Sequence, residues 1–276
     1  MRFSICALLA LLFTSCFSMT PENPVSSAAV RARVIKEIPA PALPEPVTPA
    51  APPSITVRQI SGITFEGVSF DSRKHRLVVV DQPDGPGSRF ADAAAAARAR
   101  DGIAAINAGF FTPEGNPLGL VRASGQAAGA WNGGSSLGSA VWHEGPSGNP
   151  AISRREALGR SAAAGARELI QSGPLLVENG RATGGLEATK SSARTVVLWD
   201  GGTRWWIGRG APSTLAALAR ALAHGSPAGW PVHHALNLDG GRSADLWISE
   251  TLSGGPLVRR SPWNRPVRNF LVLLPK

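Results

Sequence analysis

Two strand-like runs on either side of a glycine pair set the strongest limit on how this chain can fold. The first run, residues 235–238, is apolar and of strand length, and it ends at Asp239. Gly240 and Gly241 then break the run at a turn, where the missing Cβ atoms let backbone N–H groups approach a ligand. Beyond the turn, residues 244–248 alternate between apolar and polar, the period of two that is typical of a strand. The sequence therefore predicts a carboxylate at a strand end, beside exposed amides.

The same turn predicts a class of ligand. A carboxylate, the hydroxyl of Ser243 and free amides together form a nest of polar groups, which favours an anionic or polyhydroxylated ligand over an apolar one. An Asp-Gly pair is also the commonest signal of a tight hairpin, so a purely structural turn is the alternative.

The rest of the chain contains more strand-like than helix-like segments. Apolar or β-branched runs typical of strands lie at residues 76–81, 103–106, 139–142, 195–199 and 270–274. Ser88 is expected to cap an alanine-rich helix that ends at Gly102, and Ser213 to cap a second helix that ends at Gly225. Because strands and helices do not alternate regularly, we predict an α/β fold of the α+β type, a single domain of mixed β-sheets with few flanking helices.

Both cysteines, Cys6 and Cys16, lie in a predicted export signal, residues 1–16. A short basic start, an apolar run from Phe3 to Phe13 and small residues before Cys16 are typical of a secretory signal. Cys16 also resembles the lipidated first residue of a bacterial lipoprotein, so a lipid anchor, plain secretion and an uncleaved anchor are the alternatives. We therefore expect an exported protein, periplasmic or in the cell envelope, that meets a membrane only through a lipid on Cys16.

A proline- and alanine-rich segment, residues 17–53, separates this signal from the predicted domain, residues 54–276. It has no sustained apolar period, which indicates a semi-extended spacer, with a disordered leader that has no role of its own as the alternative. The domain has no cysteine, so it can form neither a disulfide nor a cysteine metal site. About 220 residues are enough to bury a core without such cross-links.

The chain is basic, with 28 Lys and Arg residues against 19 Asp and Glu residues and a formal net charge of +9. The excess falls on the domain, is nearly all arginine, and is scattered rather than gathered in a run. Because no nucleic-acid-binding motif accompanies this charge, we expect no nucleic-acid partner. Attraction to anionic envelope polymers or phosphorylated glycans is the better prediction for an exported protein.

The order of several short blocks resembles the phosphodiester glycosidase family. The blocks are Asn107 to Phe111, Gln171 to Gly180, Ala193 to Thr195, Asp239 to Gly241 and Arg265 to Phe270. The resemblance implies a hydrolase that cleaves the bond between a sugar and a phosphodiester in an envelope or extracellular glycan. We expect no cofactor and no metal, with a cation held at Asp239 as the alternative.

The resemblance also assigns candidate roles to single residues. Asp239 is expected to activate water or attack the sugar carbon, Arg194 to grip phosphate oxygens, and Asn107 to hold the sugar. Arg242 departs from the family pattern, in which a small residue, most often Gly, stands at this place, so the known specificity does not transfer directly. The candidate substrate-binding residues are Gln171, Ser172, Gly173, Asn237, Gly240, Gly241, Arg242, Ser243 and Asn269.

Several of these residues also have an ordinary structural role open to them. Asn107 suits a turn, Arg194 a surface salt bridge, and the Gly173-Pro174 kink a bulge that closes a sheet. We expect the kink to expose Gln171 and Ser172, because Pro cannot donate a ladder hydrogen bond. The alternative function is a noncatalytic envelope protein that binds glycan or peptidoglycan with the same cleft.

Histidine and tryptophan add two further predictions. His233 and His234 would point to opposite faces of a strand, so we expect them not to chelate a metal together. Trp131, Trp247 and Trp263 are the best-placed candidates for rings that stack on a sugar, with core packing as the alternative.

Overall fold

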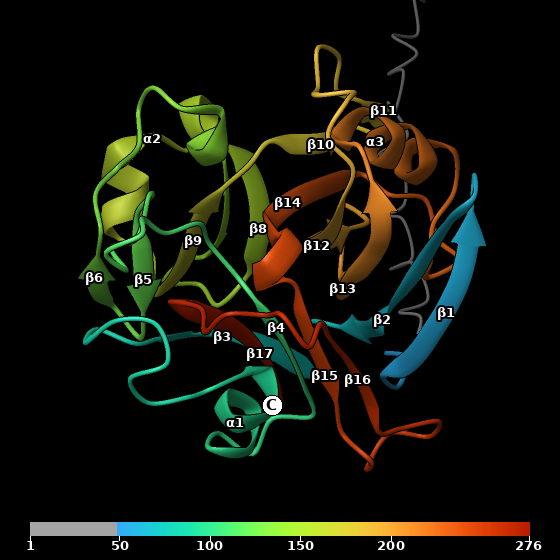
Figure 1. Ribbon diagram of the computed structural model, residues 1–276, viewed down its shortest axis with the longest axis horizontal. Helices are drawn as coiled ribbons and strands as arrows, with labels where there is room; N and C mark the ends of the chain where they lie inside the picture. The colour runs from blue at the N-terminus through green and yellow to red at the C-terminus, as the bar shows by residue number, and fades with distance from the viewer. Residues whose placement is uncertain (1–48) are drawn as a thin grey trace, which may run out of the picture. The chain divides into compact units, whose positions relative to one another are not determined.

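A computed structural model of the protein describes residues 49–276 and shows three antiparallel β-sheets around a common core (Figure 1). The predicted signal, residues 1–16, and all but the end of the predicted spacer, residues 17–53, lie outside the described residues. Within residues 49–276, no helix is both long and apolar enough to cross a membrane. The sheet-dominated domain with few flanking helices agrees with the prediction, but the predicted mixing of parallel and antiparallel strands was wrong, because all paired strands among the described residues are antiparallel.

The first sheet has seven strands, in the order β1-β2-β13-β12-β14-β10-β11. Their bounds are β1 (Ser54–Ile60), β2 (Ile63–Asp71), β13 (Arg204–Ser213), β12 (Ser192–Trp199), β14 (His234–Gly240), β10 (Leu175–Glu178) and β11 (Arg181–Ala182). A tight turn joins β12 to β13, in which Asp200 Oδ1 accepts the N–H groups of Gly202 at 2.8 Å and Arg204 at 3.0 Å. All neighbouring strands of this sheet are antiparallel, and short turns directly join β1 to β2, β10 to β11 and β12 to β13.

The second and third sheets have five strands each. The second runs β16 (Leu257–Arg260), β15 (Asp245–Ile248), β4 (Ala104–Asn107), β17 (Asn269–Pro275) and β3 (His75–Asp81). The third runs β6 (Gln126–Ala128), β5 (Val121–Ala123), β9 (Glu168–Ser172), β7 (Ala140–Glu144) and β8 (Pro150–Arg154). Both are antiparallel throughout the described strands.

The inner faces of the three sheets share one hydrophobic core. Side chains from each sheet meet there, such as Trp205 of the first, Leu271 of the second and Trp142 of the third, all fully buried. Burying a side chain of this kind contributes about 1.5–3 kcal/mol relative to exposure, so the shared core holds the sheets together. Each outer face packs against one helix, α3 (Leu215–His224), α1 (Ala93–Arg98) and α2 (Arg155–Ala164) respectively (Figure 1).

The two predicted helices form, but their caps were predicted wrongly. Helix α1 is capped by Asp92, whose side chain accepts the N–H of Ala95 at 2.8 Å, and not by Ser88. Helix α3 is capped by Thr214, because Ser213 is still part of β13. Both true caps are residues with short oxygen-bearing side chains, and the local sequence offers several of these in a row.

The glycine pair after Asp239 carries the chain from one sheet into another. After β14 the chain leaves the first sheet, makes the short 3-10 helix η2 (Gly241–Ser243) and enters the second sheet as β15. The strand predicted after the turn is confirmed. The plain hairpin alternative is wrong, because β14 pairs with β10 and β12 whereas β15 pairs with β4 and β16.

Candidate active site

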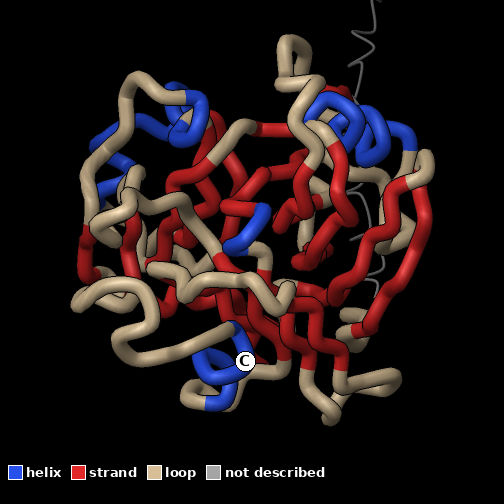
Figure 2. Tube along the Cα trace, in the orientation of Figure 1, coloured by secondary structure: helices blue, strands red, loops and turns tan. Residues whose placement is uncertain are grey.

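Asp239 lies where the ends of strands from all three sheets meet. Its backbone N–H, near the end of β14, donates to the carbonyl of Ala108, directly after β4 of the second sheet, at 3.0 Å. Ser172, the last residue of β9 in the third sheet, donates its hydroxyl to the carbonyl of Asn237 at 3.0 Å. Figure 2 shows the short helix η2 at this junction, with strand ends around it. Packing of the sheets thus gathers segments that are far apart in the sequence.

The carboxylate of Asp239 is partly exposed and is held at two points. Its Oδ1 accepts the N–H of Gly240 at 2.8 Å, and the hydroxyl of Ser243 hydrogen-bonds to the same carboxylate. Burial raises the pKa of Asp239, while the bonds from Ser243 and Gly240 and the charges of Arg265 and Arg194 oppose the rise. A carboxyl group with a raised pKa exchanges protons closer to neutral pH than an ordinary Asp does.

Arg194 lies beside this carboxylate, on the neighbouring strand. It pairs with Gly240 in the register between β12 and β14. Burial lowers the pKa of its guanidinium, and the negative charges of Glu187 and Asp239 oppose that change. Its Nε is buried and has no hydrogen-bond partner among residues 49–276. Because an unpaired buried donor is costly, this guanidinium suits a ligand that brings an anionic acceptor.

Close approach of two strands requires the first glycine of the pair. A Cβ on Gly240 would lie 2.5 Å from the carbonyl oxygen of Ala193 and 3.2 Å from the Cδ of Arg194. Gly241 has a φ of 60°, in the left-handed region that favours glycine. The sequence predicted that the amide of Gly240 is free to bind a ligand, but this N–H donates to the Asp239 carboxylate.

Asn107, the last residue of β4, is buried beneath Asp239. Its Nδ2 donates to the carbonyl of Asp239 at 2.7 Å. Its Oδ1 accepts the hydroxyl of Thr195 at 2.6 Å and the N–H of Asp245 at 3.0 Å. The sequence suggested that Asn107 holds the sugar, but the residue is 0% exposed and does not face a ligand. It is a positioning residue that joins β14 and β12 of the first sheet to the second.

Asp245 is the other carboxylate in this network, and its side chain serves helix α1. Its Oδ2 accepts the N–H of Ala93, the first residue of that helix, at 2.9 Å, and lies 3.6 Å from Nε of Arg260. Burial raises the pKa of Asp245, and the bond from Ala93 opposes the rise. Asp245 therefore supports the network beneath Asp239 and anchors α1, where a negative charge complements the helix dipole.

Ser172 and Asn237 connect the third sheet to the first. Besides the bond from the Ser172 hydroxyl, Asn237 Nδ2 donates to the carbonyl of Gly173 at 2.8 Å. Ser172 is 0% exposed, so the prediction that the Gly173-Pro174 kink exposes it was wrong. The kink instead turns polar groups inward, where they bond to β14.

Two buried amides at the junction retain an unpaired atom. Asn269 Oδ1 accepts the N–H of Gly109 at 2.7 Å, but its Nδ2 has no partner within the described part of the chain. The Oδ1 of Asn237 is likewise unpaired there. Most buried polar groups in proteins have a partner, so this donor and this acceptor are exceptions within the junction.

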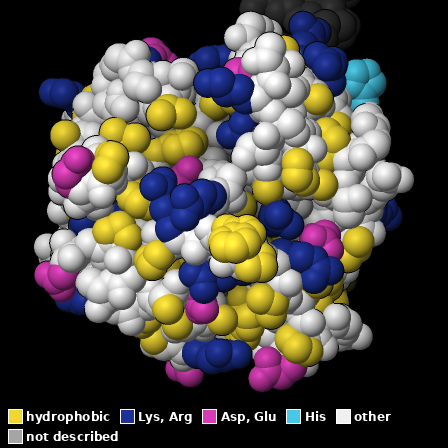
Figure 3. All heavy atoms as spheres, in the orientation of Figure 1, with side chains coloured by type: hydrophobic (Ala, Val, Ile, Leu, Met, Phe, Trp, Pro, Cys, Tyr) yellow, Lys and Arg dark blue, Asp and Glu magenta, His cyan; other side chains and the backbone are white. Residues whose placement is uncertain are grey.

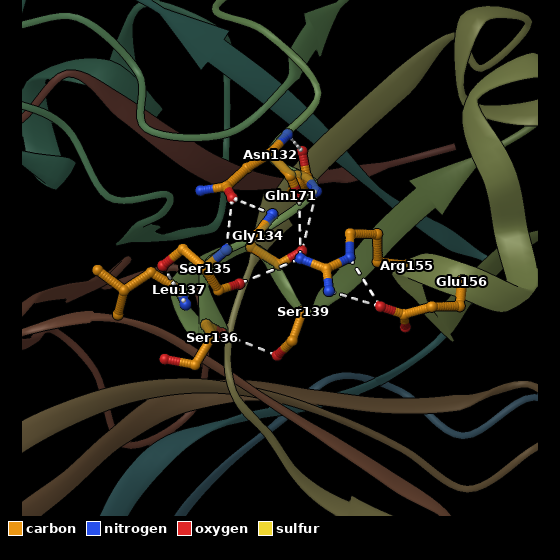
Figure 4. Close-up of polar contacts among 10 residues, drawn as sticks. Asn132, Gly134, Ser135, Ser136, Leu137, Ser139, Arg155, Glu156 and Gln171 are labelled. Carbon is orange, nitrogen blue, oxygen red and sulfur yellow. Dashed lines mark hydrogen bonds and ion pairs between the residues drawn. The ribbon is translucent and has the colours of Figure 1, made fainter.

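Gln171 is also buried, and it holds a loop in place. Its Oε1 accepts the N–H groups of Leu120 at 3.0 Å and Asn132 at 2.9 Å, and its Nε2 donates to the carbonyls of Asn132 at 2.9 Å and Gly138 at 2.8 Å. Arg155 reaches the same loop from α2, donating to the carbonyl of Asn132 at 3.0 Å (Figure 4). The predicted exposure of Gln171 was wrong, because its amide is consumed in fixing residues 132–139.

Arg242 and Arg265 form the exposed side of the site. The N–H of Arg265 donates to the carbonyl of Arg242 at 3.1 Å, so the segment that precedes β17 is joined to η2. The guanidinium carbon of Arg265 lies 5.0 Å from the centre of the Phe111 ring, and its charge lowers the pKa of Asp239. Figure 3 shows Lys and Arg side chains gathered near the middle of the face in view.

With this geometry in view, comparison with known proteins identifies the family. A model of the phosphodiester glycosidase family matches residues 100–274. The chain belongs to that family.

Similar folds occur in three solved structures. The catalytic domain of zebrafish N-acetylglucosamine-1-phosphodiester alpha-N-acetylglucosaminidase, auto-inhibited by its pro-peptide, is 19% identical with a TM-score of 0.54, over 82% of this chain and 84% of that one. A hypothetical protein from Synechocystis is 18% identical with a TM-score of 0.51, over 80% and 61%. A protein of Burkholderia pseudomallei described as exported is 14% identical with a TM-score of 0.51, over 78% and 75%. No curated protein matches the chain.

Two residues of this phosphodiester glycosidase fold were not among the candidates chosen from the sequence. Arg265 acts on Asp239 through its charge, and Thr195 holds Asn107. Both stand inside blocks that resemble the family, Arg265 to Phe270 and Ala193 to Thr195. The blocks alone could have suggested them, but only the packing of the sheets shows which side chain each one serves.

The histidine pair departs from expectation. The Nδ1 atoms of His233 and His234 lie 2.7 Å apart, so the two rings do not point to opposite faces; β14 begins only at His234. Burial lowers the pKa of His234 to about 4, and the neighbouring His233 adds to this effect. The described residues contain no group of three or more His, Cys, Asp or Glu side chains that could hold a metal ion.

A separate pocket of about 460 Å³ lies at the β10–β11 hairpin, and Asp239 does not line it. Two of its three charged lining residues pair with each other, since Arg154 Nε lies 2.6 Å from Glu178 Oε1 and Arg154 Nη2 lies 2.7 Å from Glu178 Oε2. A bidentate pair of this kind leaves little charge for a ligand. The third charged residue, Arg181, is exposed. The size of a pocket is therefore a weaker guide to chemistry here than the unpaired groups around Asp239.

Proposed function

We propose that this protein hydrolyses the bond between the anomeric carbon of a sugar and a phosphodiester oxygen, with Asp239 as the catalytic carboxylate. The observation that carries the proposal is a partly exposed carboxylate of raised pKa, fixed by Ser243 and Gly240, with the charges of Arg194 and Arg265 acting on it. Membership of the phosphodiester glycosidase family supports the same reaction class.

The two arginines suit the leaving group of this reaction. Ordinary glycosidases use a carboxylic acid to protonate a poor alkoxide leaving group, and a second carboxylate on the other side of the sugar. A phosphate leaves more readily, so stabilising its negative charge replaces much of that proton transfer. Arg194, with its unpaired Nε, and the exposed Arg265 would supply the positive charge.

Asp239 would act in its ionised form. Either it removes a proton from water as the water attacks the anomeric carbon, or it attacks that carbon itself and water then releases the sugar. In both routes the bond from the anomeric carbon to the phosphate oxygen breaks, and the electron pair stays on the phosphate. The products are the free sugar and a phosphomonoester.

The buried amides would hold this carboxylate rather than touch the sugar. Asn107 fixes the backbone of Asp239, while Ser172 and Asn237 join β14, the strand that carries Asp239, to the end of β9. An exported glycan or sugar phosphate would be the substrate, in line with the basic domain and the predicted signal.

Turnover of an aryl phosphodiester of N-acetylglucosamine tests this proposal. We expect the wild type to release the sugar, and Asp239→Asn, which keeps the shape but cannot ionise, to lose at least about 100-fold in kcat. Asp84→Asn is the matched control, because that carboxylate is 73% exposed in a surface loop. If the wild type turns over no sugar phosphodiester but binds glycan, the protein is the noncatalytic binder instead.

A further inference from the structure

Three basic side chains surround a hollow of about 360 Å³ that Asp239 does not line. They are Arg76 of β3, Arg167 just before β9 and Lys276 just after β17, and Glu144 of β7 lines the same hollow. None of the three basic side chains forms a hydrogen bond or an ion pair with any of residues 49–276. Positive charges gathered in this way attract an anionic ligand.

The hollow lies at the end of the strands that points away from Asp239. In the third sheet, β7 and β9 are antiparallel, with Ser172 at the junction of the sheets and Glu144 at the other end. In the second sheet, Asn269 begins β17 at the junction and Pro275 ends that strand beside the hollow. At about 3.3 Å per residue, β17 spans about 20 Å. The hollow is therefore separate from the candidate active site.

The backbone holds the three basic residues in place. Arg76 lies within β3, which pairs with β17. The N–H of Arg167 donates to the carbonyl of Glu144 at 2.9 Å, and the N–H of Lys276 donates to the carbonyl of Lys74 at 2.8 Å. The main chain around the hollow is thus already ordered, which limits the entropy lost on binding to that of the side chains.

A buried carboxylate without a partner lies beside the three basic residues. Glu144 is 5% exposed, and its carboxylate accepts no hydrogen bond from the described residues. Burial raises the pKa of Glu144, and the positive charges of Arg167, Lys276 and Arg76 oppose the rise. The neighbouring Glu168, by comparison, accepts two backbone N–H groups. Because buried carboxylates are normally hydrogen-bonded, Glu144 suits a ligand that brings a donor, such as a sugar hydroxyl.

Recognition in this hollow would be polar, since no aromatic ring of the described residues lines it. The rings that the sequence suggested for sugar stacking lie elsewhere. Trp247 is 3% exposed, Trp131 packs against the cluster between α2 and the third sheet, and Trp263 stands exposed before β17. A ligand in the hollow would therefore be held by charge and hydrogen bonds.

We propose that this hollow is a second, noncatalytic site that binds one phosphorylated sugar unit of an anionic glycan. Its phosphate oxygens would accept hydrogen bonds from Arg76, Arg167 and Lys276, since a guanidinium binds two phosphate oxygens at once. Glu144 would accept a hydroxyl of the same sugar. The domain would thus hold a phosphorylated chain at the end opposite to Asp239, whether or not Asp239 cleaves it.

Calorimetric titration with glucose 6-phosphate and with inorganic phosphate tests this site. We expect Arg167→Ala to weaken the binding of both at least about tenfold, the effect of losing charge-assisted hydrogen bonds. Arg220→Ala, an exposed arginine of α3, should bind both as the wild type does. The wild type should prefer glucose 6-phosphate to inorganic phosphate about tenfold, and Glu144→Gln should reduce this preference to about threefold or less.

Two further variants make the result decisive. Lys276→Gln changes another exposed side chain of the hollow and should weaken binding too, which keeps the test valid if Arg167→Ala does not fold. Arg194→Lys separates the hollow from the candidate active site. Binding that falls in Arg194→Lys but not in Arg167→Ala would place the phosphate beside Asp239 and overturn the proposal.

The remaining outcomes also decide. Equal binding by the wild type, Arg167→Ala and Lys276→Gln, a full sugar preference in Glu144→Gln, or no binding of glucose 6-phosphate by the wild type would each refute the site. Binding to phosphatidylglycerol vesicles that Arg167→Ala loses, without binding of glucose 6-phosphate, would show a membrane contact instead. Because no turnover is measured, failure of the proposed hydrolysis leaves this test unaffected.

Discussion

Replacing Asn107 by Ala tests whether the junction of the three sheets depends on one buried amide. The change removes three hydrogen bonds, to the carbonyl of Asp239, the hydroxyl of Thr195 and the N–H of Asp245. A hydrogen bond contributes about 1 kcal/mol net, and a buried group left without a partner costs about 1–3 kcal/mol. The three groups lie in a region that is almost closed to water, so we expect a loss of about 3–5 kcal/mol in the free energy of unfolding.

Urea unfolding followed by tryptophan fluorescence measures this loss. Since small domains have about 5–15 kcal/mol of stability, Asn107→Ala should still fold but with a much lower midpoint. Asn116→Ala is the control, because Asn116 is exposed and a surface change of this kind stays within about 0.5 kcal/mol. A loss below about 1 kcal/mol for Asn107→Ala would refute the reasoning, because water would then be satisfying the groups that the structure shows as buried.

Three further predictions concern the site itself. Burial raises the pKa of Asp239, and the proposed reaction needs the ionised carboxylate. We therefore expect kcat/KM to fall as the pH drops through a value above the ordinary Asp pKa of about 3.9. A pH–rate profile with its acid limb at or below about 4 would contradict this. Arg194→Lys should lower kcat/KM about 10- to 100-fold, because an ammonium group cannot bind two phosphate oxygens in a fork as a guanidinium does. The control Arg220→Lys, on the exposed side of α3, should leave kcat/KM unchanged. Equal kcat/KM for Arg194→Lys and the wild type would remove Arg194 from the mechanism. Gly240→Ala places a Cβ 2.5 Å from the carbonyl oxygen of Ala193. Thermal unfolding should therefore show a loss of about 1–3 kcal/mol in the free energy of unfolding. An unchanged Tm would mean that β12 and β14 separate easily.

Local patterns predicted much of the secondary structure. The period-two runs became strands, the shortage of helical periods became a sheet-dominated domain, and the glycine pair after Asp239 became a turn between strands. These succeed because a period of two or 3.6 records which side chains share a face, and that depends only on neighbours in the chain. The helix caps failed, because several capping residues stand close together and packing selects among them.

The proximity of some candidate site residues agrees with the sequence-based expectation. Asp239 and Arg194, which both stand in blocks that resemble the family, lie on adjacent strands. Exposure could not be predicted, since Gln171, Ser172 and Asn107 are polar residues that the structure buries and pairs. A polar side chain in a sequence looks the same whether it faces water or satisfies a buried amide.

The sequence by itself determined that the chain forms short strands with few helices, that a carboxylate stands before a glycine pair, and that its domain is basic and free of cysteine. Only the tertiary structure decided that β14 and β15 belong to different sheets and that Asn107 joins them beneath Asp239. The physical reason is distance along the chain. Asn107 and Asp245 are 138 residues apart, and a hydrogen bond between them exists only once a core shared by three sheets brings their strands together.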